Sequence, residues 1–131
     1  MTATTDEELE RLGAATYVSL TTFRRDGRAV ATPVWASREA DALWVWTEAG
    51  SGKVKRLHHD SRVLLAPCDA RGRLQGAHVE GTARVSSAPE DLERVTRLHA
   101  AKYRLAFHAW RTLGRLVRGL PEYVAVEITL P

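Results

Sequence analysis

Six short stretches of alternating or mostly apolar residues recur along this chain of 131 residues, and turn-forming residues separate most of them. They predict strands over residues 17–22, 30–35, 42–47, 62–68, 77–85 and 121–130. Consecutive strands with short connections pair as antiparallel hairpins, and Asp26-Gly27 is a preferred tight turn. Because helical patterns follow only the third and fifth stretches, we expect a mainly β (α+β) fold, a six-stranded antiparallel barrel with short helices.

Helical patterns lie before, between and after these strands, and the length of the chain suits one domain spanning residues 1–131. We predict helices over residues 6–13 and 53–59, and two helical stripes after Ser87. The stripes consist of Leu92, Val95, Leu98 and Leu105, followed by Ala106, Trp110, Leu113 and Val117. The segment Ser37–Asp41 shows neither the alternation of a strand nor the spacing of a helix, and it is expected to form a turn.

The junction between the strand at 42–47 and the helix at 53–59 carries an unusual charge pattern. A Gly-Ser-Gly turn precedes Lys53, Lys55 and Arg56, which we expect in the first helical turn. A helix N-terminus already carries partial positive charge, so cations there repel one another unless they share an anion. The pattern therefore predicts a phosphate bound by the helix N-terminus, the Ser51 hydroxyl and these side chains. The alternatives are a solvated basic helix face and a Ser51 that acts only as the N-cap.

Charge and composition exclude several classes of protein. The net charge is +3, and basic stretches at 51–62 and 102–118 are offset by acidic clusters, unlike a uniformly basic nucleic-acid binder. No run approaches the roughly 20 apolar residues of a membrane-spanning helix. The acidic N-terminus lacks an apolar signal region, which predicts a cytoplasmic location. We expect the basic stretch at 102–118 to form a solvated helix face, and the alternative is contact with a coenzyme tail or a substrate.

No constellation of side chains predicts a metal site or a catalytic residue. His58 and His59 are adjacent, so their rings point apart. His78, His99 and His108 lack ligand spacing and are expected to be exposed or partly buried. Cys68, the only cysteine, is expected to be a buried inert thiol. Trp44 and Trp46 share one face of their strand and are expected in the core of a barrel or of a dimer.

Three stretches together resemble a known superfamily. They are Tyr17–Phe23 with Asp26-Gly27-Arg28 and Thr32–Trp35, then Leu43–Thr47 with Ser51–Leu57, then Arg62–Gly72 with Val79–Val85. In this order they resemble the FMN-binding split-barrel type of flavin and deazaflavin oxidoreductases, the superfamily of pyridoxamine 5′-phosphate oxidase. The Ala66–Gly72 stretch is most similar to small enzymes that use the deazaflavin coenzyme F-420 rather than FMN.

The resemblance implies a homodimer with two coenzyme sites at the subunit interface. It implies that Thr32, Pro33, Val34 and Trp35 lie along the coenzyme ring and that the segment from Ser51 to Arg56 takes the phosphate. Thr47, at the end of the preceding strand, joins this predicted site. The structural alternative for Thr32–Trp35 is that Pro33 occupies an edge strand, where its missing N–H costs nothing. The anionic tail of a deazaflavin would use more cations than the single phosphate of FMN needs.

The resemblance also implies a function, an oxidoreductase that transfers a hydride between reduced coenzyme F-420 and a small conjugated or unsaturated molecule. Such chemistry needs no protein nucleophile, which agrees with the lack of a catalytic constellation. One alternative is an FMN-dependent enzyme of the pyridoxamine-phosphate oxidase kind. Another is a non-catalytic protein that binds a flavin or a tetrapyrrole, because one fold supports several functions.

Overall fold

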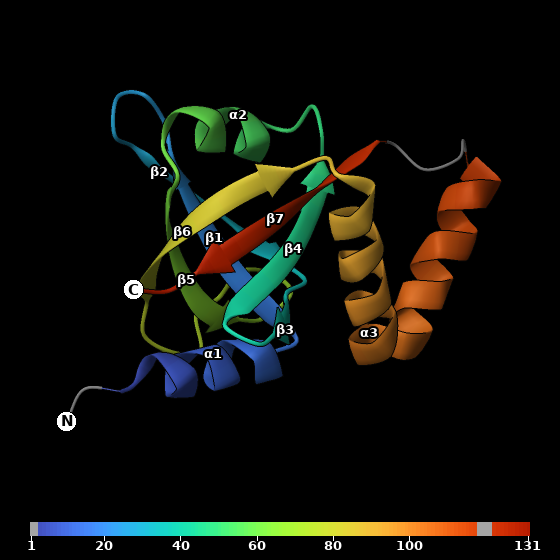
Figure 1. Cartoon of the computed structure of the whole chain (residues 1–131), viewed down its shortest axis with the longest axis horizontal. Coiled ribbons are helices and arrows are strands. Elements are labelled where there is room, and N and C mark those ends of the chain that lie inside the picture. The colour runs from blue at the N-terminus through green and yellow to red at the C-terminus, as the bar shows by residue number, and fades with distance from the viewer. Residues whose placement is uncertain (1–2, 118–121) are drawn as a thin grey trace.

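The computed structural model describes residues 3–117 and 122–131, with side chains for residues 3–113 and 122–131. Its strands are β1 (Tyr17–Phe23), β2 (Ala29–Val34), β3 (Ser37–Glu39), β4 (Ala42–Glu48), β5 (Arg62–Cys68), β6 (Val79–Ser86) and β7 (Tyr123–Thr129). Its helices are α1 (Thr5–Ala14), α2 (Gly52–His59) and α3 (Pro89–Val117). Figure 1 shows a strongly curved sheet with α1 and α2 at opposite ends and α3 beside β4 and β7.

The sheet is antiparallel throughout, and its strands follow the order β2-β1-β5-β6-β7-β4-β3. The split-barrel prediction is confirmed, and β2 is an edge strand as expected from Pro33. The prediction of six strands is wrong, because the described residues form seven. The additional strand is β3, which lies within the segment predicted to be a turn.

The strand β3 escapes sequence patterns because it is only three residues long. Ser37, Arg38 and Glu39 pair with Trp44, Leu43 and Ala42, so Ala40 and Asp41 alone connect β3 to β4. Ala40 has a φ of 52°, a conformation that hairpin turns require and that glycine or asparagine usually supplies. A turn without these residues gives no recognisable signal in the sequence.

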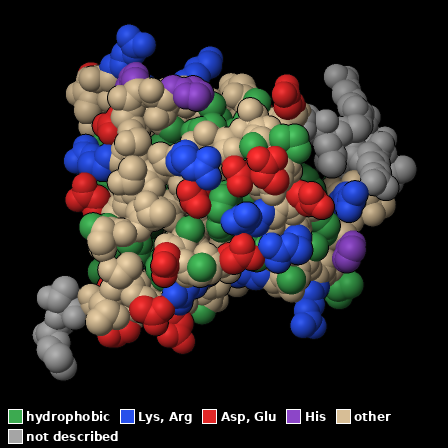
Figure 2. All heavy atoms as spheres, viewed as in Figure 1, with side chains coloured by type: hydrophobic (Ala, Val, Ile, Leu, Met, Phe, Trp, Pro, Cys, Tyr) green, Lys and Arg blue, Asp and Glu red, His purple; other side chains and the backbone are tan. Residues whose placement is uncertain are grey.

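The main core lies inside the curved sheet. Leu9 and Leu12 of α1 are fully buried there, and they pack in one cluster with Val18, Leu65 and Ile128 from three different strands. Their spacing of three residues places both leucines on one face of α1, while the acidic first turn faces solvent. In Figure 2 acidic side chains gather over the α1 end, and cationic and histidine side chains gather over the α2 end.

Helix α3 is interrupted at Arg104, whose φ of 41° and ψ of −106° are not helical. The chain therefore folds back, and Figure 1 shows the two halves of α3 side by side. The predicted apolar stripes hold only in part, since Leu105 is 84% exposed and Leu113 is 63% exposed while Phe107 is buried. Val117 is predicted to belong to the second stripe, but its side chain is not among those that the structure describes. No helix among residues 3–117 and 122–131 has the length and apolar character to cross a membrane.

Candidate functional site

A cavity of about 440 Å³ lies where two strands separate. Its first wall is Pro33, Val34 and Trp35 at the end of β2, and its second wall is Trp46, Thr47 and Glu48 at the end of β4. Only the first three residues of β4 pair with β3, so in the described chain Val45–Glu48 is hydrogen-bonded on one side only, to β7. The cavity occupies the place of the missing neighbour.

The register of β3 explains which residues line the cavity. Ser37 pairs with Trp44, and continuing this antiparallel register would place Trp35 opposite Trp46 and Val34 opposite Thr47. The next step would place Pro33 opposite Glu48. Instead, β2 diverges to pair with β1, and Pro33 could not donate a hydrogen bond to β4 in any case. The cavity therefore lies where the hydrogen-bonded ladder between β3 and β4 is interrupted, and the side chains of the unpaired positions form its walls.

The polar end of the cavity lies at the start of α2. Ser51 is the N-cap of α2 and its Oγ accepts a hydrogen bond from the backbone N–H of Val54 at 3.4 Å. The same Oγ lies 3.2 Å from Oγ1 of Thr47, and Lys53 also lines the cavity. Two hydroxyls, free N–H groups and an ammonium therefore meet there, a donor set that suits an anion.

The electrostatics of Lys53 favour a bound anion. Burial lowers the pKa of its ammonium, and repulsion from Arg56 lowers it further, while Glu48 raises it. Glu48 is the only acid among the described residues that line the cavity. A second negative group near Lys53 would stabilise the charged ammonium, because an opposite charge offsets the cost of its burial.

The structure separates the three predicted cations. Lys55 and Arg56 line a second cavity, of about 520 Å³, with Arg24, Arg25, His58 and His59. The prediction that all three occupy the first turn is wrong, because Arg56 lies in the last turn of this eight-residue helix. Its side chain nevertheless folds back over Gly52, where a Cβ atom would lie 2.7 Å from Nη1. Glycine at this position thus allows the guanidinium to reach the helix start.

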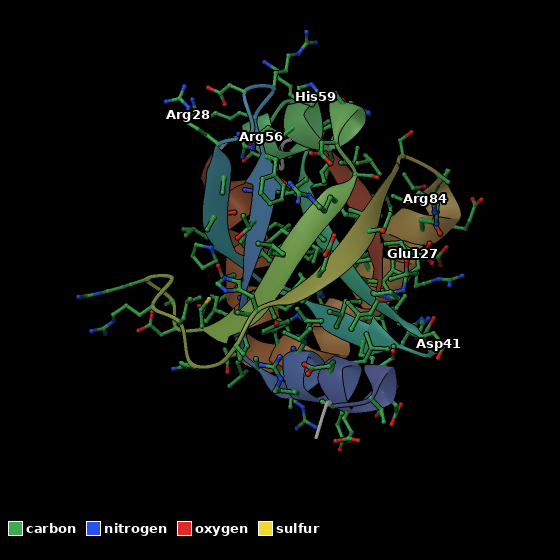
Figure 3. All side chains as sticks on the ribbon, turned by 90° about the vertical axis from the view of Figure 1, so that its left-hand side faces the viewer. Arg28, Asp41, Arg56, His59, Arg84 and Glu127 are labelled. Carbon is green, nitrogen blue, oxygen red and sulfur yellow. The ribbon has the colours of Figure 1, made fainter. Side chains whose placement is uncertain are left out.

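The second cavity gathers positive charge at the end of the barrel formed by α2 and the β1–β2 hairpin. Arg56 is oriented by a hydrogen bond from its Nε to Oγ1 of Thr22, at 2.6 Å. Burial, followed by repulsion from Arg24, lowers the pKa of Arg56. Figure 3 shows Arg56 and His59 at this end of the molecule. No acidic residue that the structure describes lines this cavity.

Aromatic side chains form the rest of the first cavity. Trp46, Trp110 and Tyr123 line it and contact one another, with ring centroids 4.9–5.7 Å apart. Trp44 is buried beneath helix α3 as expected. Trp46 packs against the same cluster, but it is only half-buried and also lines the cavity, so the structure bears out its predicted place in the barrel core only in part.

The first half of α3 supports the aromatic walls from behind. His99 is 0% exposed, so the expectation that it is exposed or only partly buried is wrong. Its ring meets Trp46 edge-on at 5.0 Å, and its Nδ1 lies 2.7 Å from Oγ of Ser37. Burial, with repulsion from Lys102, lowers its pKa to about 3, so the ring is neutral at ordinary pH. Its Nε2 has no hydrogen-bond partner in the described structure.

Lys102 also departs from its expected place on a solvated helix face. Its Nζ donates hydrogen bonds to the carbonyl oxygens of Ala15 and Ala36, which ties α3 to the start of β1 and to the segment before β3. Burial lowers the pKa of Lys102 to about 8. The expectation of a solvated face extends to Arg115 and Arg118, whose side chains lie outside the described residues.

Comparison with known proteins assigns this fold to a family. A family model described as pyridoxamine 5′-phosphate oxidase matches residues 4–130. The chain belongs to the pyridoxamine 5′-phosphate oxidase family. No curated protein matches the chain by sequence.

Solved structures share the fold of this family member at low sequence identity. A conserved hypothetical protein of Mycobacterium tuberculosis is 23% identical, with a TM-score of 0.72 over 99% of this chain and 82% of its own. An F-420 reductase is 14% identical, with a TM-score of 0.62 over 92% and 90%. A haem storage protein of Vibrio cholerae is 10% identical, with a TM-score of 0.67 over 96% and 89%. At these identities the likeness establishes the fold alone.

The structure brings together six of the nine predicted coenzyme-binding residues of this family member. They are Pro33, Val34, Trp35, Thr47, Ser51 and Lys53. Thr32 lines neither cavity, and its buried Oγ1 has no hydrogen-bond partner among the described residues. Lys55 and Arg56 line the second cavity.

Sequence reasoning missed five residues that line the first cavity, namely Tyr17, Trp46, Glu48, Trp110 and Tyr123. Tyr17 and Tyr123 begin strands, where an aromatic residue is common and says nothing of a site. Trp110 reaches the cavity only because α3 folds back at Arg104. The sequence shows a change of helical stripe between Leu105 and Ala106, but it does not show that the helix folds back there.

Proposed function

We propose that this protein is a deazaflavin-dependent oxidoreductase that transfers a hydride between reduced coenzyme F-420 and a small conjugated molecule. The observation that carries the proposal is the connection between two sites. One is an aromatic cavity whose polar end suits an anion, and the other is a basic cavity with no acid among the described residues that line it. A coenzyme with a flat ring, a phosphate and a longer anionic tail would use both.

Arg56 connects the two cavities. Its guanidinium packs against Gly52 at the start of α2, while its charge affects Lys53 on one side and is affected by Arg24 on the other. The positive potential therefore extends from the polar end of the first cavity into the second. A string of anionic groups would relieve the repulsion between these cations, whereas a single phosphate would relieve it at one end only.

The residues present fit such a coenzyme. Thr47, Ser51 and Lys53 would bind the phosphate, Pro33, Val34 and Trp35 would lie along the ring, and Lys55 and Arg56 would contact the tail. The bound coenzyme would supply the hydride chemistry. The chain's own contribution would be to position the ring against the walls and to exclude water with Trp46, Trp110 and Tyr123.

An FMN-dependent enzyme is the second candidate. Lys53 is the only cationic side chain among the described residues of the first cavity, and one cation with two hydroxyls suits a single phosphate. On this alternative, Lys55 and Arg56 would belong to a separate surface and would not affect coenzyme binding.

We also propose that the protein acts as a homodimer with the coenzyme sites at the interface. The outer face of β2 supports this proposal, because Ala29, Ala31 and Pro33 are all exposed and apolar on an edge strand. An exposed apolar edge strand is a favourable surface for association. Pro33 also lines the first cavity, so a partner that covers β2 would help to enclose the site.

Titration of the purified protein with FMN and with coenzyme F-420 tests the proposed function. The coenzyme fluorescence should change on binding, and F-420 should bind more tightly and lose more affinity than FMN when salt is raised. Tight binding of FMN with negligible binding of F-420 would overturn the proposal. Binding of either coenzyme without reduction of any conjugated acceptor would instead indicate a binding or storage role.

A further inference from the structure

A third cavity, of about 320 Å³, lies on the far side of the aromatic wall. It opens between the two halves of α3 and the start of β7. Leu92 and Thr96 line it from the first half of α3, and Phe107 and Arg111 line it from the second half. Glu122 completes the part that is not shared with the coenzyme cavity. This volume is at the lower end of the range for small-molecule sites.

Three aromatic residues form a wall common to both cavities. Trp46, Trp110 and Tyr123 line the third cavity and also the proposed coenzyme cavity. Trp46 contacts Phe107 with nearly parallel rings, 6.0 Å apart at 20°, and Trp110 with tilted rings, 4.9 Å apart at 34°. The third cavity thus has four aromatic rings and one leucine in its lining, which favours flat ligands that stack or meet ring edges.

The polar groups of the third cavity indicate a ligand without net charge. Arg111 and Glu122 are exposed and have opposite charges, so they offer hydrogen-bond donors and acceptors but no net charge. The Thr96 hydroxyl is already used, because it donates to the carbonyl oxygen of Leu92 at 2.8 Å. A charged ligand would have to leave water for a mostly apolar lining, which is costly.

We propose that this third cavity binds a flat, uncharged molecule of one or two conjugated rings with a hydroxyl or carbonyl substituent. The site is separate from the coenzyme cavity, and it does not depend on which coenzyme that cavity takes. Because Trp46, Trp110 and Tyr123 serve both cavities, occupation of one changes the environment of rings that line the other. The fold-back of α3 at Arg104 creates the site, since it brings Phe107 and Trp110 to the cavity.

Calorimetric titration of the full chain with 2-naphthol tests the proposal. We expect saturable binding to one site per chain. The anionic analogue 2-naphthoate and the cationic analogue 2-naphthylmethylammonium should each bind roughly tenfold more weakly or worse, because the lining is apolar. Equal binding of the neutral and the charged compounds would overturn the assignment of the ligand class.

Substitutions at Thr96 locate the site. Thr96→Phe fills the cavity and should weaken 2-naphthol binding by roughly tenfold or more. Thr96→Val keeps the shape of the side chain and should leave 2-naphthol binding unchanged. Thr96→Leu provides an intermediate filling if the phenylalanine variant fails to fold, as judged by circular dichroism. Thr112→Phe adds the same ring at an exposed position of α3 and should change nothing. Unchanged binding in folded Thr96→Phe or Thr96→Leu would overturn the proposal.

A second pair of variants separates this site from the coenzyme site. Ser51→Ala and Lys53→Ala alter only the polar end of the first cavity and should leave 2-naphthol binding unchanged. Loss of 2-naphthol binding in both of these variants would place the ligand in the first cavity and refute a separate site. Failure of FMN and F-420 to bind would refute the proposed function without affecting this result.

Discussion

The indole of Trp35 lies flat on the phenol ring of Tyr103, with 4.2 Å between ring centroids and 9° between ring planes. Trp35 lines the proposed coenzyme cavity and Tyr103 lies on α3, so the stack fixes a wall of the site to the helix that packs behind it. The Tyr103 hydroxyl adds backbone contacts, since it accepts from the N–H of Ala36 and lies within hydrogen-bond distance of the Thr16 and Ala36 carbonyl oxygens.

Removing the Tyr103 hydroxyl should destabilise the protein while the stack on Trp35 remains. Tyr103→Phe leaves the N–H of Ala36 without this acceptor, which typically costs about 1–3 kcal/mol. Urea unfolding measures the change. Tyr123→Phe is the control, because the described structure shows no hydrogen bond from that hydroxyl, and it should change stability by less than about 0.5 kcal/mol. Equal effects of the two variants would contradict the role given to Tyr103.

The two cation sites should differ in their effect on the two coenzymes. Lys53→Ala should weaken the binding of both FMN and F-420 by roughly tenfold, because a charge-assisted contact to the phosphate that both coenzymes carry is lost. Lys55→Ala should weaken F-420 alone, and Arg25→Ala provides a second variant from the same basic cavity. Fluorescence titration gives the affinities, and thermal unfolding should show little change. If Lys55→Ala weakens FMN and F-420 alike, the basic cavity has no special role for a tail.

His99 should make the protein sensitive to acid. Its pKa is about 3 in the folded state and near 6.5 in the unfolded state, so the unfolded state binds more protons between these values. Stability should therefore fall as the pH is lowered from 6.5 towards 3, with a limiting slope of about 1.4 kcal/mol per pH unit. His99→Gln should remove this part of the slope, and urea unfolding between pH 7 and about 5 measures it before most carboxylates titrate. A variant with an unchanged slope would contradict the prediction.

Arg104 should tolerate glycine better than any other substitution. Its φ of 41° is unfavourable for a residue with a Cβ atom, and glycine adopts such a conformation without strain. We expect Arg104→Gly to stabilise the protein by about 0.5–1 kcal/mol and Arg104→Ala to give no gain. Thermal and urea unfolding compare the three proteins. Destabilisation by glycine would show that the Arg104 side chain contributes more than its backbone costs.

The exposed face of β2 should control self-association. Ala31→Arg places a charge in the apolar face formed with Ala29 and Pro33 and should shift a dimer towards the monomer. Sedimentation velocity over a range of concentrations measures this shift. Thr82→Arg, at an exposed position of β6, should have no such effect. A wild-type protein that is monomeric at all concentrations would refute the proposed dimer.

The sequence predicts the fold better than the site because strand periodicity is local and cavities are not. The strand at 62–68 is predicted with its observed bounds, and the other predicted strands overlap the observed ones. The three-residue strand β3 is missed because it is too short for a period and its turn contains Ala40-Asp41. The Ser51 cap and the edge position of β2 follow from residue types alone, and both are confirmed.

The rest of the site depends on relations that no local pattern encodes. Lys53 and Lys55 are two residues apart, yet they line different cavities because successive helical positions differ by about 100°. Trp110 reaches the cavity through the break at Arg104. His99 is buried because it packs behind Trp46, a residue that lies 53 positions away in the chain.

The hydrogen-bonded pairing of β4 with β3 stops where the cavity begins, so the number of paired residues sets the length of the cavity opening. A strand rises about 3.3 Å per residue, so each residue by which the pairing of β3 extended further along β4 would shorten the opening by that length. Pro33 lacks the N–H that pairing at the far end would need, and Trp35 and Trp46 line the near end. A family that varies only the length of this one short pairing could therefore adjust the length of its coenzyme opening in steps, without altering its core.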